Sequence, residues 1–252
     1  MNTLPALPAP DLDREIADLA RALRRANGPL MTLVNKLGGG IEKQLALVPA
    51  RFRNEVERVT EAALRAAFGL GGRVPAVGRR GTLAAAIASG AAGGAGGLAT
   101  SVAELPVTIA VILKAIREEA AAAGFDPDQE SVRGACLEVF AAGSPLAADD
   151  GVNTSFLSAR LTLTGPALQK VIATIAPRLA AAMGPKLAAQ AVPVLGAVSG
   201  AALNAAYLGY YREMARIRFA LMRLTVQHGA EAVLTRFSAA TAPPRLTESR
   251  PS

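Results

Sequence analysis

Apolar residues recur every three or four positions along most of the 252-residue chain, which is the spacing of amphipathic helices. Asp11 can cap a first helix that runs to about residue 27, where Asn27-Gly28-Pro29 predicts its end. The helical pattern resumes over 30–47, although Gly38-Gly39-Gly40 interrupts it within this range. A further helix is predicted over 50–68. No segment alternates with the period of two that a strand requires, so the pattern predicts an all-α fold.

Two uncharged runs, 82–103 and 191–211, differ from these amphipathic segments. Small residues recur every four positions in both runs, which gives each predicted helix a narrow, smooth face that another helix backbone can approach closely. The glycines on these faces are Gly90, Gly93, Gly94, Gly97, Gly196 and Gly200. We therefore expect a single multi-helix domain with two Gly/Ala-rich, closely packed central helices.

A lone carboxylate, Glu104, ends the first run directly before Leu105-Pro106. Proline suits the first turn of a helix, so Pro106 predicts the start of a second helix that runs to about residue 123. One interpretation places Glu104 at the N-terminus of that helix, where it would accept hydrogen bonds from free backbone N–H groups. The other is a buried carboxylate that serves as a ligand, a proton carrier or an anchor for a cationic partner. We favour the capping interpretation.

The second run contains one amide side chain, Asn204, in line with its glycines. Asn204 can hydrogen-bond Glu104 or a backbone carbonyl across the packed helices. A role in fixing helix register is favoured over ligand binding. Glu104 and Asn204 together form the candidate polar site, with either a functional or a structural role.

Turn and cap signals divide the rest of the chain. Asp126-Pro127 opens a short helix that contains Cys136, a long helical stretch is predicted over 153–184, and a basic helix follows residue 211. The chain therefore divides into a leader with the first helix (1–27), a helical domain (28–237) and a disordered tail (238–252).

The chain carries a formal charge of +7 and a pI near 10.2. This charge favours contact with anionic partners, either nucleic acid or a phospholipid surface. No stretch has consecutive basic residues interleaved with aromatics, so we expect no nucleic-acid binding. A single cysteine excludes an internal disulfide and fits a reducing compartment. The expected location is cytoplasmic, at the inner face of a membrane.

Residue types that carry catalytic or metal chemistry are scarce. Cys136 and His228 are the only cysteine and histidine, and a nucleophilic pair would need them adjacent in the fold. Cys136 lies among apolar residues, which indicates a small buried side chain. One histidine and one cysteine cannot supply a usual zinc ligand set, and the glycines near 90–97 lack the Gly-Lys-Ser/Thr of a nucleotide-binding loop. We therefore expect no metal and no cofactor.

Several blocks, in order, resemble the EcsC protein family of bacteria. They are a glycine-rich run closing on Glu104-Leu105-Pro106, the turn Gly124-Phe125-Asp126, the helix around Cys136-Leu137 and a late segment from Val192-Pro193 to Asn204. The resemblance covers roughly 28–225. It implies an association with ABC-transporter components through the gene that names the family, and it supplies no catalytic residues.

These observations favour a non-enzymatic, membrane-associated accessory or interaction protein whose partner is an anionic membrane surface or a membrane protein. The alternatives are a membrane-proximal hydrolase with Glu104 as acid/base, and a carrier of an apolar ligand. Both uncharged runs also have the roughly 20 residues needed to cross a bilayer, although they contain few large aliphatic side chains. Partial insertion as a glycine-zipper hairpin is therefore the alternative to a helical domain at the membrane surface. The sequence leaves the oligomeric state open.

Overall fold

The computed structural model describes residues 11–38, 50–70, 78–95, 98–142 and 193–242. All regular structure in these ranges is helical, which confirms the predicted all-α class for the described part of the chain. The helices are α1 (Leu12–Gly38), α3 (Ala50–Leu70), α4 (Gly78–Ala95), α5 (Leu98–Ala122), α6 (Glu130–Ala142), α9 (Pro193–His228) and α10 (Ala230–Thr241).

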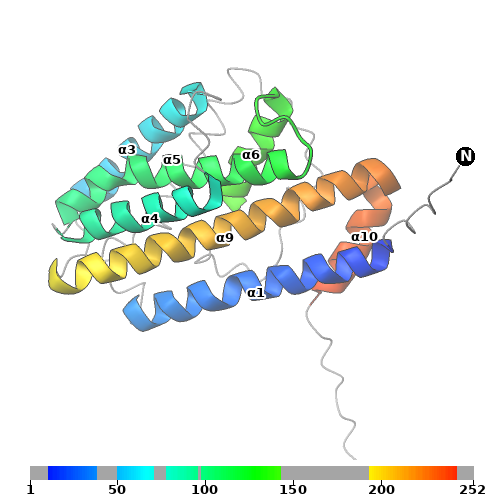
Figure 1. The fold of residues 1–252 in the computed structure, drawn as a ribbon, viewed down its shortest axis with the longest axis horizontal. Coiled ribbons are helices and arrows are strands. Elements are labelled where there is room, and N and C mark those ends of the chain that lie inside the picture. The colour runs from blue at the N-terminus through cyan, green and yellow to red at the C-terminus, as the bar shows by residue number, and fades with distance from the viewer. Residues whose placement is uncertain (1–10, 39–49, 71–77, 96–97, 143–192, 243–252) are drawn as a thin grey trace, which may run out of the picture.

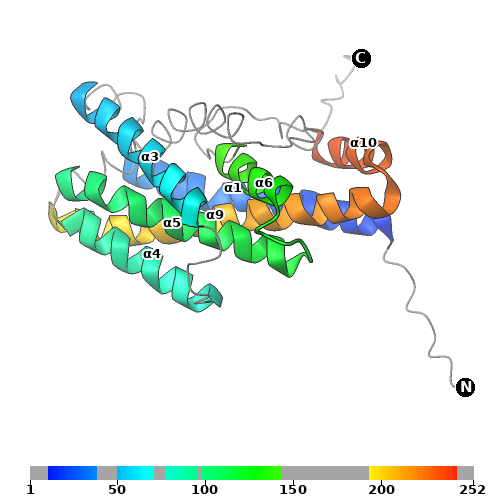
Figure 2. The same cartoon turned by 90° about the horizontal axis from the view of Figure 1, so that it is seen from above.

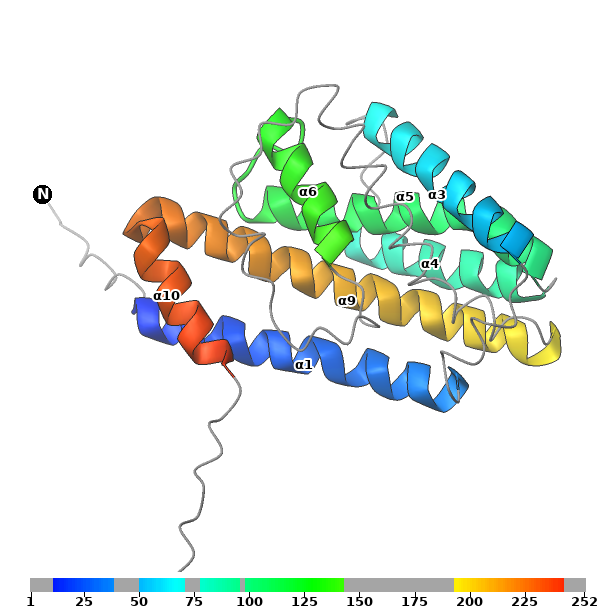
Figure 3. The same ribbon diagram turned by 180° about the vertical axis from the view of Figure 1, so that it is seen from behind.

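The longest described helix, α9, runs through the body and is the element on which the others are arranged (Figure 1). Helices α4 and α5 pack against its first half, and α1 and α10 pack against its second half. On the other side of α5 lie α3 and α6, as the view from behind shows (Figure 3). Helix α4 lies at the edge of this arrangement (Figure 2).

Two apolar clusters hold the helices together. The larger one joins α3, α5, α6 and α9, and its aromatic centre includes Phe140 and Tyr211, whose ring centroids are 5.1 Å apart. The smaller one joins α1, α9 and α10 through side chains such as Leu23, Leu221 and Phe237. Among the described side chains, the contact of α9 with α4 is less bulky: a small cluster of Ala86 from α4, Ala115 from α5 and Leu208 from α9 lies there.

The predicted end of the first helix at Gly28-Pro29 is wrong, because α1 continues through both residues to Gly38. Glycine and proline disfavour a helix interior, but the packing of α1 against α9 outweighs that local cost. The predicted domain boundary at residue 27 therefore falls inside a helix. Helix α1 is described as far as Gly38, and the rest of the glycine triplet, where an interruption was expected, lies outside the described residues.

The C-terminal half also differs from the sequence prediction. The uncharged run and the basic helix after it form one continuous helix, α9. The predicted tail from residue 238 begins too early, because α10 extends to Thr241. Phe237 is buried against α1 and α9, and Arg24 of α1 donates a hydrogen bond to the carbonyl of Ala240 at 3.0 Å, so tertiary contacts hold these residues. The helix predicted over 153–184 lies outside the described residues, as do 243–252.

The boundaries of α4 and α5 change the position of Glu104. Helix α5 begins at Leu98, so Pro106 lies inside it rather than in its first turn. Glu104 is therefore in the second turn of α5, and the prediction that it caps a helix starting at Pro106 is wrong. Gly124 has a φ of +89°, a conformation that commonly follows the end of a helix, and α5 ends at Ala122, close to the predicted residue 123.

The close packing expected of the two Gly/Ala-rich helices is confirmed at Gly90 of α4. A Cβ atom added there would overlap the carbonyl oxygen of Gly200 in α9, and it would lie 2.7 Å from the Gly200 carbonyl carbon. It would also lie 2.8 Å from Nδ2 of Asn204. The two backbones are thus in direct contact, and a side chain larger than hydrogen does not fit between them.

We predict that Gly90→Ala lowers the free energy of unfolding by about 1–3 kcal/mol, because the backbone of Gly200 cannot move aside as a flexible side chain could. Gly209→Ala is the matched control: Gly209 lies in the interior of α9, and a Cβ there meets nothing within 4 Å. This control should stabilise the protein by about 0.5–1 kcal/mol through helix propensity. Urea unfolding of the two variants measures the difference, and equal stabilities would contradict the close approach.

Candidate functional site

The two polar residues expected to form a site lie together in the interior, where α4, α5 and α9 meet. Glu104 is 8% exposed and Asn204 is 1% exposed. Nδ2 of Asn204 donates a hydrogen bond to Oε1 of Glu104 at 2.7 Å. The hydroxyl of Thr108, one turn later in α5, donates to the same carboxylate oxygen. The predicted hydrogen bond between Asn204 and Glu104 is therefore present.

Asn204 also connects α9 to α4. Its Nδ2 lies 3.0 Å from the carbonyl oxygen of Ala86, 3.1 Å from Oγ of Ser89 and 3.3 Å from Oγ1 of Thr108. One amide group thus contacts hydrogen-bond acceptors on both neighbouring helices. Its own carbonyl oxygen is buried and has no hydrogen-bond partner among the described residues. The arrangement fixes how the three helices align, which agrees with the register role favoured for Asn204.

Gly93 lets the carboxylate approach α4. A Cβ at Gly93 would lie 2.6 Å from Oε2 of Glu104 and 3.0 Å from its Cβ. The hydroxyl of Thr100 donates to the Gly93 carbonyl oxygen at 2.7 Å, which adds a second contact between the start of α5 and the end of α4. Of the six predicted packing glycines, Gly90, Gly93 and Gly200 are buried where the helices meet.

The remaining predicted glycines are less fully described. Gly94 lies in α4 and Gly196 lies in α9, but their surroundings fall outside the described side chains, and Gly97 falls outside the described residues. Gly209, later in α9, is exposed, and a Cβ there would meet nothing within 4 Å, so it is not a packing glycine.

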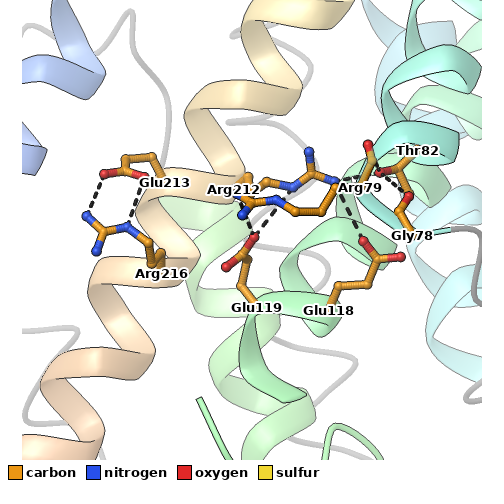
Figure 4. A network of polar contacts seen from close by, with 8 residues as sticks. All are labelled: Gly78, Arg79, Thr82, Glu118, Glu119, Arg212, Glu213 and Arg216. Atoms are coloured by element: carbon orange, nitrogen blue, oxygen red, sulfur yellow. Dashed lines mark hydrogen bonds and ion pairs between the residues drawn. The ribbon is translucent and has the colours of Figure 1, made fainter. Parts of the chain in front are cut away.

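A second polar cluster, at the N-terminal end of α4, was not predicted as a unit (Figure 4). Nη2 of Arg212 in α9 donates to Oγ1 of Thr82 in α4 at 2.5 Å. Arg212 also forms ion pairs with Glu118 at 3.6 Å and with Glu119 at 3.5 Å, both in α5. Arg79 of α4 forms an ion pair with Glu119 at 3.3 Å. The cluster therefore joins the same three helices as the Glu104 cluster, nearer the other end of α4.

Burial lowers the pKa of Arg212, and repulsion from Arg79 lowers it further, whereas Glu118 and Glu119 raise it. The Arg212 side chain is 11% exposed and the Glu119 side chain 9% exposed, so each charge requires the other. The sequence contained one relevant signal, since Glu118 and Glu119 are adjacent acids near the end of a largely apolar helix. It held no sign that an arginine about ninety residues later would lie beside them.

A separate buried ion pair links α6 to α9. Nη2 of Arg218 donates to Oε2 of Glu138 at 2.9 Å, and the two side chains are 4% and 12% exposed. Burial raises the pKa of Glu138 and the charge of Arg218 opposes that shift, while burial lowers the pKa of Arg218. This pair holds α6 against α9.

The outward side of α4 is apolar. Its only two large aliphatic side chains, Leu83 and Ile87, are 40% and 42% exposed. Val107 of the adjacent helix α5 is 49% exposed. The buried positions of α4 carry small residues instead: Thr82, Ala86, Gly90 and Gly93. Helix α4 therefore has an inverted pattern, with small residues inside and its bulky aliphatic residues on the surface.

The lone cysteine and histidine do not form a pair. Cys136 lies in the apolar cluster around α6, whereas His228 is exposed at the end of α9. Burial raises the pKa of the Cys136 thiol to about 12, so the thiol is protonated near neutral pH. Among the described residues, no three His, Cys, Asp or Glu side chains converge in the way that a metal ion requires.

Comparison with known proteins places these clusters in a family. The model of the EcsC protein family matches residues 78–224, which is more than half of the chain. The chain belongs to the EcsC protein family. No curated protein and no solved structure matches it.

The match begins with α4 and ends near the end of α9, so it is narrower than the 28–225 expected from the sequence blocks. It includes every residue of the Glu104 cluster and of the Arg212 cluster. Helices α1, α3 and α10 lie outside it. The EcsC segment of this chain thus contains both polar clusters and the exposed apolar side of α4.

The two uncharged runs were the candidates for a membrane hairpin. Within the part of the chain that the structure describes, no helix has the length and apolar character needed to cross a membrane.

We predict that Glu104→Ala lowers the free energy of unfolding by about 3 kcal/mol, because it removes the carboxylate that accepts hydrogen bonds from both Asn204 and Thr108 in the interior. Glu104→Gln keeps a side-chain oxygen in nearly the same place and should cost clearly less. Chemical denaturation of both variants at neutral pH measures the difference. If Gln is as destabilising as Ala, the two hydrogen bonds are not what makes Glu104 important for stability.

We predict that Cys136 does not react with a thiol-specific aromatic disulfide at pH 8 in the folded protein. Its raised pKa keeps the thiol protonated, and the surrounding core excludes the reagent. The same thiol should react at once after unfolding in urea, which serves as the positive control. Rapid reaction of the native protein, followed by its absorbance change, would contradict the buried position.

Proposed function

We propose that this EcsC-family protein is a non-enzymatic, membrane-associated accessory protein that docks through the outward side of α4. The observation that carries the proposal is the inverted pattern of this helix. Leu83 and Ile87 are partly exposed, yet they are the largest apolar side chains on α4. Exposed apolar surface of this kind is typical of a binding surface.

The apolar character extends onto the neighbouring helix. Between residues 103 and 110 of α5, the exposed side chains are apolar: Ala103, Pro106, Val107 and Ala110. The two helices run antiparallel, because Gly93 of α4 lies beside Glu104 and Arg79 lies beside Glu119. No charged residue other than the buried Glu104 occurs between residues 82 and 113. A lipid surface or the apolar side of a membrane protein matches such a surface.

The positive charge of the chain supports a membrane as the partner, because an apolar partner without negative charge would not use it. The formal charge of +7 favours the negative inner surface of a membrane, and the expected cytoplasmic location would place the protein there. A link to ABC-transporter components, implied by the family resemblance, would fit an accessory role at that surface.

The hydrolase alternative depends on Glu104 as an acid or base. The carboxylate is held by Asn204 and Thr108 and is packed against Gly93, which supports a structural role instead. A surface depression at the α9–α10 turn is lined by His228, Gly229 and Arg236, and Glu104 is not part of it. The carrier alternative has no such specific observation in its favour.

We predict that Ile87→Glu reduces binding to phospholipid vesicles by at least about tenfold, since a carboxylate at this position opposes insertion of the apolar side of α4. Flotation of the protein with vesicles through a density gradient measures the bound fraction. Thermal unfolding should show little change, because Ile87 is exposed.

Val226→Glu is the matched control. Val226 is 81% exposed near the end of α9, so the substitution changes charge and apolar area in the same way, far along α9 from its contacts with α4. It should bind vesicles like the unaltered protein. Lack of vesicle binding by the unaltered protein would overturn the proposal, as would equal losses in the two variants.

A further inference from the structure

The exposed side of α4 carries positive charge at one end only. Arg79, Leu83 and Ile87 are spaced by four, so they lie along one line of the helix. Arg80 begins the neighbouring line, which continues with exposed alanines at 84 and 88. Helix α4 contains no acidic residue. The surface therefore changes from two arginines to apolar side chains within about one helical turn.

Arg79 is available to an external anion although it has a partner in the protein. Its side chain is 68% exposed, and its ion pair is with Glu119. Glu119 is also paired with Arg212, which is 11% exposed and remains in place. If Arg79 turns toward an anion, the buried carboxylate of Glu119 still has Arg212 beside it, which it then shares with Glu118, so the cost of releasing Arg79 is reduced.

Arg80 can bind an anion without leaving a partner in the protein. It is exposed, and it forms no ion pair or side-chain hydrogen bond with the residues that the structure describes. The two glutamates of the nearby cluster are balanced by Arg79 and Arg212, so the charge of Arg80 is left over. The free backbone N–H groups of the first turn of α4 add further positive potential at the same end.

From this arrangement we infer that the outward side of α4 binds the surface of an anionic phospholipid bilayer, with Arg79 and Arg80 on lipid phosphates and Leu83 and Ile87 among the upper acyl chains. The inference rests on the proposed function and adds the lipid class and the orientation. Arginine forms bidentate hydrogen bonds to phosphate oxygens, and the apolar positions follow on the same face. The helix lies in the interface, as amphipathic surface helices do, and α9 supports it from behind.

The test compares vesicles of phosphatidylcholine alone with vesicles that also contain phosphatidylglycerol. The unaltered protein should bind the anionic vesicles more tightly, and this preference should weaken as salt is added. In the double variant Arg79→Gln/Arg80→Gln the preference should fall about tenfold, while binding to neutral vesicles through Leu83 and Ile87 persists. Arg80→Gln alone leaves the Glu119 ion pair intact and should lose part of the preference.

The charge-matched control is Arg14→Gln/Arg25→Gln. Both arginines are exposed on α1 and form no ion pair with the described residues, so the net charge changes equally on another helix. Thermal unfolding checks that every variant is folded. An equal loss in this control would show a general charge effect and overturn the lipid site. Binding to neutral and anionic vesicles alike would also overturn it, but would leave the proposed docking function standing. Absence of binding to both overturns the function itself.

Discussion

The contact between the backbones of Gly90 and Gly200 is the constraint on which the arrangement of α4 depends. No side chain fits between the two helices at Gly90, and the other buried positions of α4 carry only small residues, namely threonine, alanine and glycine. Such residues bury little apolar area, so the hydrophobic effect contributes less here than at the aromatic core around Tyr211. Hydrogen bonds and ion pairs from α5 and α9 to α4 help to define how α4 is aligned. These side chains can contact α4 because the helices are so close.

Two polar clusters follow from that closeness. Asn204 reaches α4 and α5 together, and Arg212 reaches both helices nearer the start of α4. Buried charges of this kind add little net stability compared with apolar packing, but they tolerate only one alignment of the helices. The same constraint moves Leu83 and Ile87 to the outside, so the internal packing of the EcsC segment and its candidate docking surface have one cause.

Local sequence signals predicted the helices well but not all of their ends. Gly28-Pro29 and Pro106 were interpreted as boundaries, and both lie inside helices. Proline and glycine disfavour a helix by only a few kcal/mol. Packing against α9 offsets such a cost for α1, and one face of α5 is buried against α3, α6 and α9. Because α5 starts at Leu98 and not near Pro106, Glu104 lies inside the helix as a buried partner of Asn204 and does not cap it.

The sequence by itself determined the all-helical class and the close approach of the two small-residue faces, and it marked Asn204 and Glu104 as polar residues beside those faces. These features follow from periodicity and residue size, which act over a few neighbouring positions. Only the tertiary structure decided that α4 exposes its aliphatic side and that Arg212 meets Glu118, Glu119 and Thr82. A repeat of small residues shows that one face of a helix can be approached closely, but the other face is covered or left open according to where distant segments pack.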